Sequence, residues 1–72
     1  MQTLREFTGR VWYAQKIVIV DLSKMPEDGN IFDHALFKGE NWKLQSVMHR
    51  QLMDRWVKAC GVCDDHMVIQ VI

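Results

Sequence analysis

Four consecutive aliphatic residues, Ile17 to Val20, constrain the fold of this chain more than any other feature. They lie in a β-branched and aromatic segment, residues 11–22, that predicts a strand. Because successive side chains of a strand point to opposite faces of the sheet, a sheet with one wet face alternates apolar and polar residues. The run does not alternate, so the sequence predicts a strand that is covered on both faces.

The size and composition predict one small domain over residues 1–72. The chain is 49% hydrophobic and carries nine basic and nine acidic side chains, a balance typical of a folded rather than a disordered protein. A domain of this size buries only roughly 60% of its unfolded surface, and small domains often add disulfides, a metal or a second subunit. The zero net charge argues against a nucleic-acid partner, because domains that bind nucleic acid are usually basic.

The sequence does not predict a membrane or secreted protein. Cys60 and Cys63 are the only cysteines, which is too few for a disulfide framework. The first six residues are polar where a signal peptide would be apolar. The longest aliphatic run has four residues, against the ~20 that span a bilayer. We therefore expect a cytoplasmic protein without a membrane partner.

The pattern along the chain predicts an α+β fold. The expected elements follow the order β-β-α-α-β over residues 2–8, 11–22, 31–37, 42–60 and 66–72. The 31–37 segment is interpreted as a short helix, although a strand fits it almost as well. Gly61 is placed to end the long helix. We expect a small antiparallel sheet of three strands, covered on one face by the one long helix.

Trp42 and Trp56 fall on the apolar face of the predicted 42–60 helix and are its expected anchors. Trp56 is predicted to be buried, so its replacement by alanine is expected to cost on the order of 3–5 kcal/mol. The opposite side of the helix carries a basic strip formed by Lys43, Arg50 and Lys58, with Arg55 at its border. Asp54 lies in the middle of that strip at i,i+4 spacing, so the strip is interpreted as a solvated face.

The segment that contains Cys60, Cys63 and His66 is the one motif with metal-ligand spacing. A closed zinc site needs a fourth ligand, but His49 lies about 16 Å from Cys60 along a helix, and His34 reaches it only if its segment folds back. A redox pair fits less well, because a helix C-terminus favours the protonated thiol. The favoured interpretation is a pair of reduced structural thiols, with no metal and no cofactor.

No catalytic residue is predicted. The sequence has no glycine-rich phosphate loop, no GxSxG elbow and no spacing of paired carboxylates. His49 falls at the edge of the apolar helix face, where a histidine is more often a hydrogen-bonded structural residue than a catalyst. The sequence therefore favours a protein that is not an enzyme.

The alternative function is a nucleic-acid-binding module. Its best candidate residues are Arg10, Trp12, Tyr13 and Lys16, together with the basic strip of the predicted helix. Aromatic side chains interleaved with basic ones form platforms on which bases stack. The neutral net charge keeps this hypothesis second.

Five methionines and three tryptophans in 72 residues favour a small interaction or regulatory protein that docks on another protein. These residue types adapt to interfaces or anchor them, although they also fill small cores. The β-β-α-β outline is common among accessory proteins of phages, plasmids and other mobile elements. That analogy concerns size and shape, and function does not follow from it.

The two aliphatic strands also predict a homodimer. The predicted long helix covers one face of the sheet, and a monomer would expose an aliphatic patch that soluble proteins seldom leave uncovered. A symmetric dimer is the commonest solution, with the sheets paired face to face or edge to edge. The candidate interface residues are Ile17, Val18, Ile19, Val20, Met67, Val68, Ile69, Val71 and Ile72.

Overall fold

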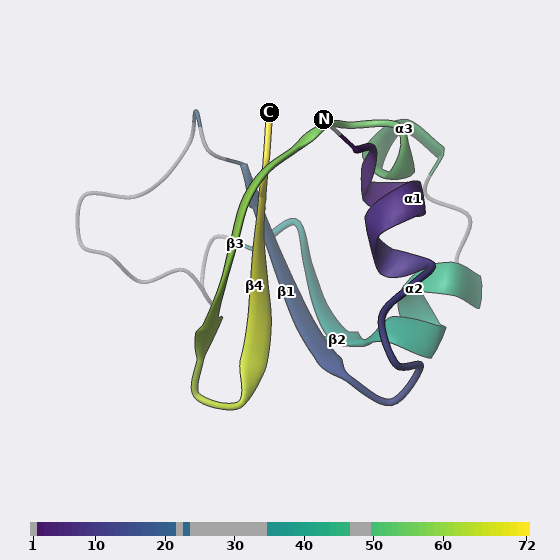
Figure 1. Cartoon of the computed structure of the whole chain (residues 1–72), viewed down its shortest axis with the longest axis vertical. Coiled ribbons are helices and arrows are strands. Elements are labelled where there is room, and N and C mark those ends of the chain that lie inside the picture. Colours follow the sequence, from purple (N-terminus) through teal and green to yellow (C-terminus); the bar gives the residue numbers. More distant parts are fainter. Residues whose placement is uncertain (1, 22, 24–34, 47–49) are drawn as a thin grey trace.

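The computed structural model describes residues 2–21, 23, 35–46 and 50–72, which form a four-stranded sheet and three short helices (Figure 1). In chain order the elements are α1 (Leu4–Thr8), β1 (Lys16–Asp21), β2 (Phe37–Glu40), α2 (Asn41–Ser46), α3 (Arg50–Met53), β3 (Val57–Cys63) and β4 (His66–Val71). The strand order is β2-β1-β4-β3. β1 pairs antiparallel with β2 and parallel with β4, and β3 and β4 form an antiparallel hairpin. The fold is therefore α+β with a mixed sheet.

The predicted three-stranded antiparallel sheet under one long helix is wrong. The 42–60 segment contains two short helices, α2 and α3, and the beginning of β3, while its residues 47–49 lie outside the described part. Asp64 and Asp65 have φ angles of 49° and 63°, as in the two-residue turns that join hairpin strands. Gly61 does not end a helix and lies inside β3 opposite Val68. Pairing across this turn outweighs the helical spacing of the apolar residues.

The first predicted strand, residues 2–8, is wrong as well, because this segment forms the helix α1. The Thr3 hydroxyl accepts a hydrogen bond from the Glu6 N–H, and the Glu6 carboxylate accepts one from the Thr3 N–H. This reciprocal capping box stabilises the first turn of a helix. A short helix of this kind needs packing to persist, which Leu4 supplies from within the core.

The remaining predicted elements are partly confirmed. The last strand is present as β4, and the second is present as β1, although residues 11–15 form a loop and the strand begins only at Lys16. In the 31–37 segment, Phe37 opens the strand β2, so the helical interpretation fails there. Residues 31–34 lie outside the described part.

Both faces of β1 are covered within the single chain. One face belongs to a core formed by Leu4, Ile17, Ile19, Leu44, Met53, Ile69 and Val71. The other face packs Val18 and Val20 with Val68, Ala35 and Cys63. All four residues of the aliphatic run are at most 1% exposed, so the prediction of a strand covered on both faces is confirmed. One copy alone therefore buries both faces of this strand.

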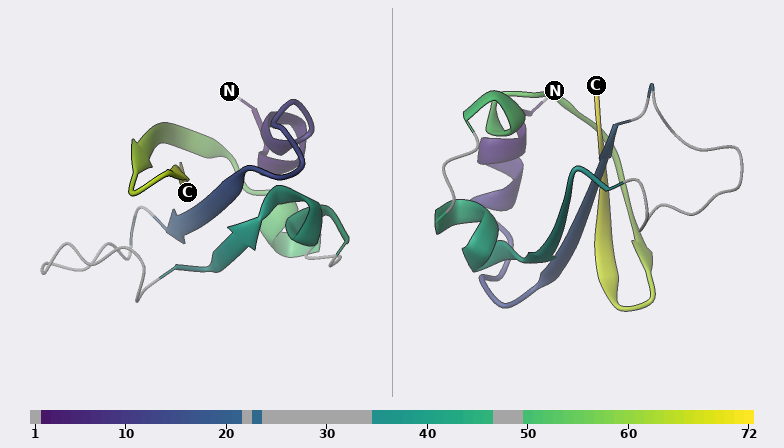
Figure 2. Two further views of the ribbon diagram at one scale, coloured as in Figure 1. Left: turned by 90° about the horizontal axis from the view of Figure 1, so that it is seen from below. Right: turned by 180° about the vertical axis from the view of Figure 1, so that it is seen from behind.

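The helices gather on the β2 side of the sheet, and the β3–β4 hairpin stands on the other side (Figures 1 and 2). The segment that leads into β3 reaches the helical side, where Trp56, one residue before the strand, forms an antiparallel bridge with Thr3. Among the described helices, the longest has six residues, and none is long and apolar enough to cross a membrane.

Arg55 links three parts of the chain at the start of β3. Its guanidinium lies 2.6 Å from the Asp21 carboxylate at the end of β1 and donates to the carbonyl of Ile72 at 3.2 Å. Its own carbonyl accepts a hydrogen bond from the Leu4 N–H at 2.8 Å. The Ser23 hydroxyl, which donates to Asp21, and Arg55 together lower the pKa of Asp21 to about 2. The ionised carboxylate therefore holds Arg55 at this junction.

Candidate docking site

The loop between α1 and β1, residues 9–15, presents two large aromatic side chains to solvent. Trp12 and Tyr13 are each 66% exposed, and their ring centroids lie 5.7 Å apart with an interplanar angle of 63°. This edge-to-face arrangement is one that aromatic pairs prefer. We call residues 9–15 the aromatic loop. The aromatic loop therefore exposes a contiguous apolar area to water, and burying that area against a partner would be favourable.

A buried amide from α2 holds the aromatic loop in place. Asn41 is 2% exposed, and its Nδ2 donates hydrogen bonds to the carbonyls of Thr8 at 3.0 Å and Val11 at 2.9 Å. Its backbone N–H donates to the carbonyl of Gln15 at 2.9 Å. The Oδ1 atom accepts from Gln45 Nε2 at 3.1 Å. Buried polar groups that are satisfied in this way fix one conformation, so Asn41 sets the path of the loop.

Hydrogen bonds within the loop fix the two aromatic residues further. The Gln15 N–H donates to the carbonyl of Trp12 at 3.0 Å, which closes a turn with Tyr13 at its second position. The carbonyl of Tyr13 accepts from the backbone N–H of Trp42 at 2.8 Å. The loop therefore lies directly against the start of α2.

Trp42 adds a third aromatic side chain to this surface. It is 45% exposed, and its Nε1–H donates to the Glu40 carboxylate at 2.9 Å. The Lys43 ammonium lies 5.4 Å from the ring centroid, within the range of a cation–π contact. Trp42 was expected to be buried as a helix anchor, and that expectation is wrong.

We define the docking surface as the exposed or partly exposed residues Arg10, Trp12, Tyr13, Lys16, Glu40, Trp42 and Lys43. It combines three aromatic rings with three cations and one carboxylate. Four of its members, Arg10, Trp12, Tyr13 and Lys16, were named from the sequence because aromatic and basic residues alternate there. The other three come from the end of β2 and the start of α2, and no local sequence pattern connects them to the loop.

The basic strip predicted on one helix does not form as one surface. Lys43 lies on α2, Arg50 on α3 and Lys58 on β3. Asp54, which was expected to pair within the strip, instead forms an ion pair with Arg5 of α1. Only Lys43 of this group belongs to the docking surface.

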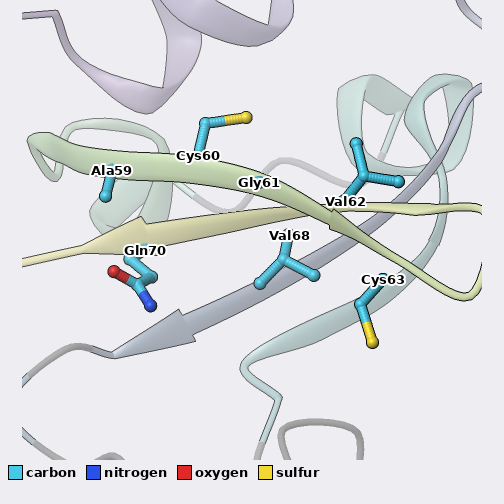
Figure 3. Close-up of a pocket in the computed structure, with 7 residues that line it drawn as sticks. All are labelled: Ala59, Cys60, Gly61, Val62, Cys63, Val68 and Gln70. Carbon is cyan, nitrogen blue, oxygen red and sulfur yellow. The ribbon is translucent and has the colours of Figure 1, made fainter.

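The structure does not bring Cys60, Cys63 and His66 together. Both cysteines lie on β3 and are unpaired, and Figure 3 shows their side chains on opposite sides of the strand. Cys63 lies opposite His66, but His66 Nδ1 is 2.7 Å from the carbonyl of Asp64. In the described part of the chain, no three side chains form a metal-ligand cluster. His34 and His49 lie outside the described residues.

The thiols line an open pocket beside β3 with a volume of about 330 Å³, formed by Ala59, Cys60, Gly61, Val62, Cys63, Val68 and Gln70 (Figure 3). Partial burial raises the pKa of the Cys60 thiol, which disfavours the reactive thiolate. The predicted position of Cys60 at a helix C-terminus is wrong, because the residue lies in a strand. Five of the seven residues that line the pocket belong to β3, which is an edge strand of the sheet.

The side chains named as dimer-interface candidates are mostly buried inside one chain. Ile17, Val18, Ile19, Val20, Ile69 and Val71 are at most 1% exposed, and Val68 is 8% exposed. Met67 is half-buried, and only Ile72, at 48%, is exposed.

No protein-family model, curated protein or solved structure matches this chain.

Proposed function

We propose that this chain is a small non-enzymatic interaction protein that docks on another protein through the docking surface. The observation that carries the proposal is the exposure of Trp12 and Tyr13, 66% each, on a loop fixed by the buried Asn41. The partner is a protein surface with an apolar pocket and an acidic rim, because Arg10 and Lys16 flank Trp12 and Tyr13 along the chain and Lys43 lies over the Trp42 ring.

Tryptophan, tyrosine and arginine supply most of the binding free energy at protein interfaces. A rigid loop that already holds such side chains in place loses little conformational entropy when it binds. The described groups with displaced pKa values, Asp21 and Cys60, belong to the Arg55 junction and to β3. What the docking surface itself offers is contact area, hydrogen bonds and charge. The two reduced cysteines support a cytoplasmic location as part of the proposal.

The test is affinity capture from the source cells with two tagged variants. In Trp12→Ala/Tyr13→Ala the exposed rings are removed, and in the matched control Val62→Ala an apolar side chain that is 81% exposed is removed from β3. We expect both variants to keep the far-UV circular dichroism of the natural chain. A partner that the natural chain and the control retain, and that the double variant loses, supports the proposal. Equal retention by all three proteins contradicts it.

A nucleic-acid-binding module is the second candidate, because Trp12 and Tyr13 are exposed between Arg10 and Lys16. Two features weigh against it: the net charge is zero, and the 63° angle between the two rings prevents them from offering parallel faces to successive bases. Tryptophan fluorescence during titration with single-stranded oligonucleotides checks it. Quenching that weakens steeply with salt is expected only if this second candidate is right.

A further inference from the structure

Among the described residues, none covers most of the sheet edge at β3. β3 is the last strand in the order β2-β1-β4-β3, and its residues from Lys58 to Val62 are all exposed. Between Ala59 and Cys63 it carries neither proline nor a charged side chain. Proteins usually protect an edge strand with one of these.

The hairpin geometry identifies the backbone groups that face outward. Cys63 and His66 flank the two-residue turn and are opposite each other, as in the hydrogen-bonded pair that closes such a hairpin. Alternation along the ladder then directs the N–H and C=O groups of Gly61 toward β4. The same alternation directs those of Cys60 and Val62 away from β4, toward solvent.

The chain itself covers the beginning of this edge. The Val57 N–H donates to the carbonyl of Gln2 at 2.8 Å, and Thr3 bridges to Trp56. The uncovered stretch therefore runs from Lys58 to the turn at Asp64. Its central residue is Gly61.

We propose that two copies of this chain pair β3 to β3, antiparallel, about a twofold axis at Gly61. A symmetric antiparallel pair places residues of constant summed number opposite each other. With the axis at Gly61, Cys60 lies opposite Val62 of the second copy, and their outward backbone groups form the ladder. The two four-stranded sheets then become one continuous sheet.

The length of the open stretch selects this register. Moving the axis to Cys60 would bring Trp56 and Val57 into the pairing, where Gln2 and Thr3 already lie. Moving the axis to Val62 would shorten the paired stretch to residues 60–64. The axis at Gly61 alone uses the whole stretch without displacing the N-terminal segment.

Charge complementarity identifies a second copy as the occupant. The register places Lys58 opposite Asp64 of the second copy, and symmetry produces this contact twice. Both side chains are exposed, and neither forms an ion pair within the described residues. Val62, which is 81% exposed, gains a neighbour in Cys60 of the second copy, and the zero net charge adds no repulsion between copies.

The dimer leaves the docking surface of each copy free. The aromatic loop adjoins α2, on the helical side of the molecule, and reaches the hairpin at its turn, where Gln15 Nε2 donates to the carbonyl of Asp65 at 3.4 Å, while the strand β3 itself runs along the far edge of the sheet (Figure 1). The assembly would present two docking surfaces, and it would bind a repeated partner with avidity that a monomer lacks.

Sedimentation equilibrium of charge-reversal variants tests the register. Lys58→Glu and Asp64→Lys each make both contacts repulsive in a homodimer, and we expect each to raise the dimer dissociation constant about tenfold or more. In an equimolar mixture, both contacts of the heterodimer join opposite charges, so dimers are expected to return. Arg50→Glu on α3, with the same charge change as Lys58→Glu at an exposed position outside β3 and outside the docking surface, is expected to leave the dissociation constant unchanged.

A natural chain that remains monomeric at millimolar concentration would overturn the proposal, as would folded single variants that dimerise like the natural chain. A mixture that fails to recover dimers would also overturn it. If the positive φ of Asp64 prevents Asp64→Lys from folding, Val62→Lys replaces it as the test of β3 pairing. We expect this variant to be monomeric, because a lysine at the centre of the edge opposes pairing. Unchanged dimerisation of that variant would contradict β3 pairing. Loss of the docking partner in Trp12→Ala/Tyr13→Ala concerns the proposed function alone and leaves this test unaffected.

Discussion

The two edges of the sheet differ in how they are protected. β2 has four residues, among them the charged Lys38 and Glu40, and it runs directly into α2. β3 has seven residues and a bulge near Lys58, and its following stretch is uncharged and exposed. Short, charged edges resist pairing with other chains, whereas long uncharged edges invite it. The charged residues and the short length of β2 thus disfavour pairing at that edge of the sheet. The long uncharged stretch of β3 leaves the other edge able to pair with a partner strand.

Proline substitutions at neighbouring positions of β3 break or confirm the assignment of its open side. Gly61→Pro removes an N–H that points toward β4, and we expect it to lower the free energy of unfolding by about 3 kcal/mol or more. Val62→Pro removes an outward N–H, and we expect a loss of roughly 1 kcal/mol, because edge positions tolerate proline. Urea denaturation followed by circular dichroism measures both. Equal losses would show that the outward side has been assigned incorrectly.

The inner strands were predictable from the sequence, and the edges were not. β1 and β4 contain aliphatic runs whose burial on both faces follows from the absence of alternation. β3 also carries apolar residues at helical spacing, and only its pairing with β4 across Asp64 and Asp65 decides between strand and helix. The helix α1 did have a local signature, Thr3 followed three residues later by Glu6.

The candidate site was predictable to the same extent. Trp12 and Tyr13 were identified because they adjoin basic residues in the sequence. The role of Asn41 depends on contacts with Thr8 and Val11, about thirty residues away, and local patterns do not encode such contacts. From its place before the predicted 42–60 helix, Asn41 would be assigned only the role of a helix cap.

Asn41→Ala tests whether the buried amide, next to β2, fixes the conformation of the aromatic loop. The substitution removes the amide that donates to the carbonyls of Thr8 and Val11, of which Thr8 keeps the Val11 N–H at 3.1 Å. We therefore expect the free energy of unfolding to fall by about 2 kcal/mol. We also expect the aromatic loop to become more mobile, which would lower the fluorescence anisotropy of Trp12. The measurement uses a chain in which Trp12 is the single remaining tryptophan. Gln45→Ala, which removes a donor to Asn41 from an exposed residue, is the milder control. A loop with unchanged anisotropy in Asn41→Ala would mean that the amide does not fix it.

Trp56→Ala examines the covered beginning of the β3 edge. Because Trp56 is 47% exposed, we expect a loss of roughly 1–2 kcal/mol, scaled from the apolar area that remains buried. The prediction that Trp56 is a buried helix anchor is therefore wrong, and the loss on the order of 3–5 kcal/mol expected for a buried tryptophan is too large. Thermal unfolding gives the difference, with Ile69→Ala as the buried reference, for which the expected loss is about 3–4 kcal/mol. Equal losses for the two variants would place Trp56 in the core.

The smallest expected effect concerns pH and the Arg55 junction, which holds that same covered end. The pKa of Asp21 is lowered from 3.8 to about 2 by the Ser23 hydroxyl and Arg55, so its stabilising contribution is fully present above about pH 4. As the pH falls from 3.8 toward 2, the unfolded chain takes up a proton before the folded chain does, and that contribution is lost. We therefore expect the urea midpoint of the natural chain to fall more steeply over this range than that of Asp21→Asn. Asp54→Asn, whose ion pair with Arg5 is exposed, is expected to keep the natural slope, because exposed ion pairs contribute little. An Asp21→Asn protein with the natural slope would show that Asp21 does not stabilise the junction through its charge.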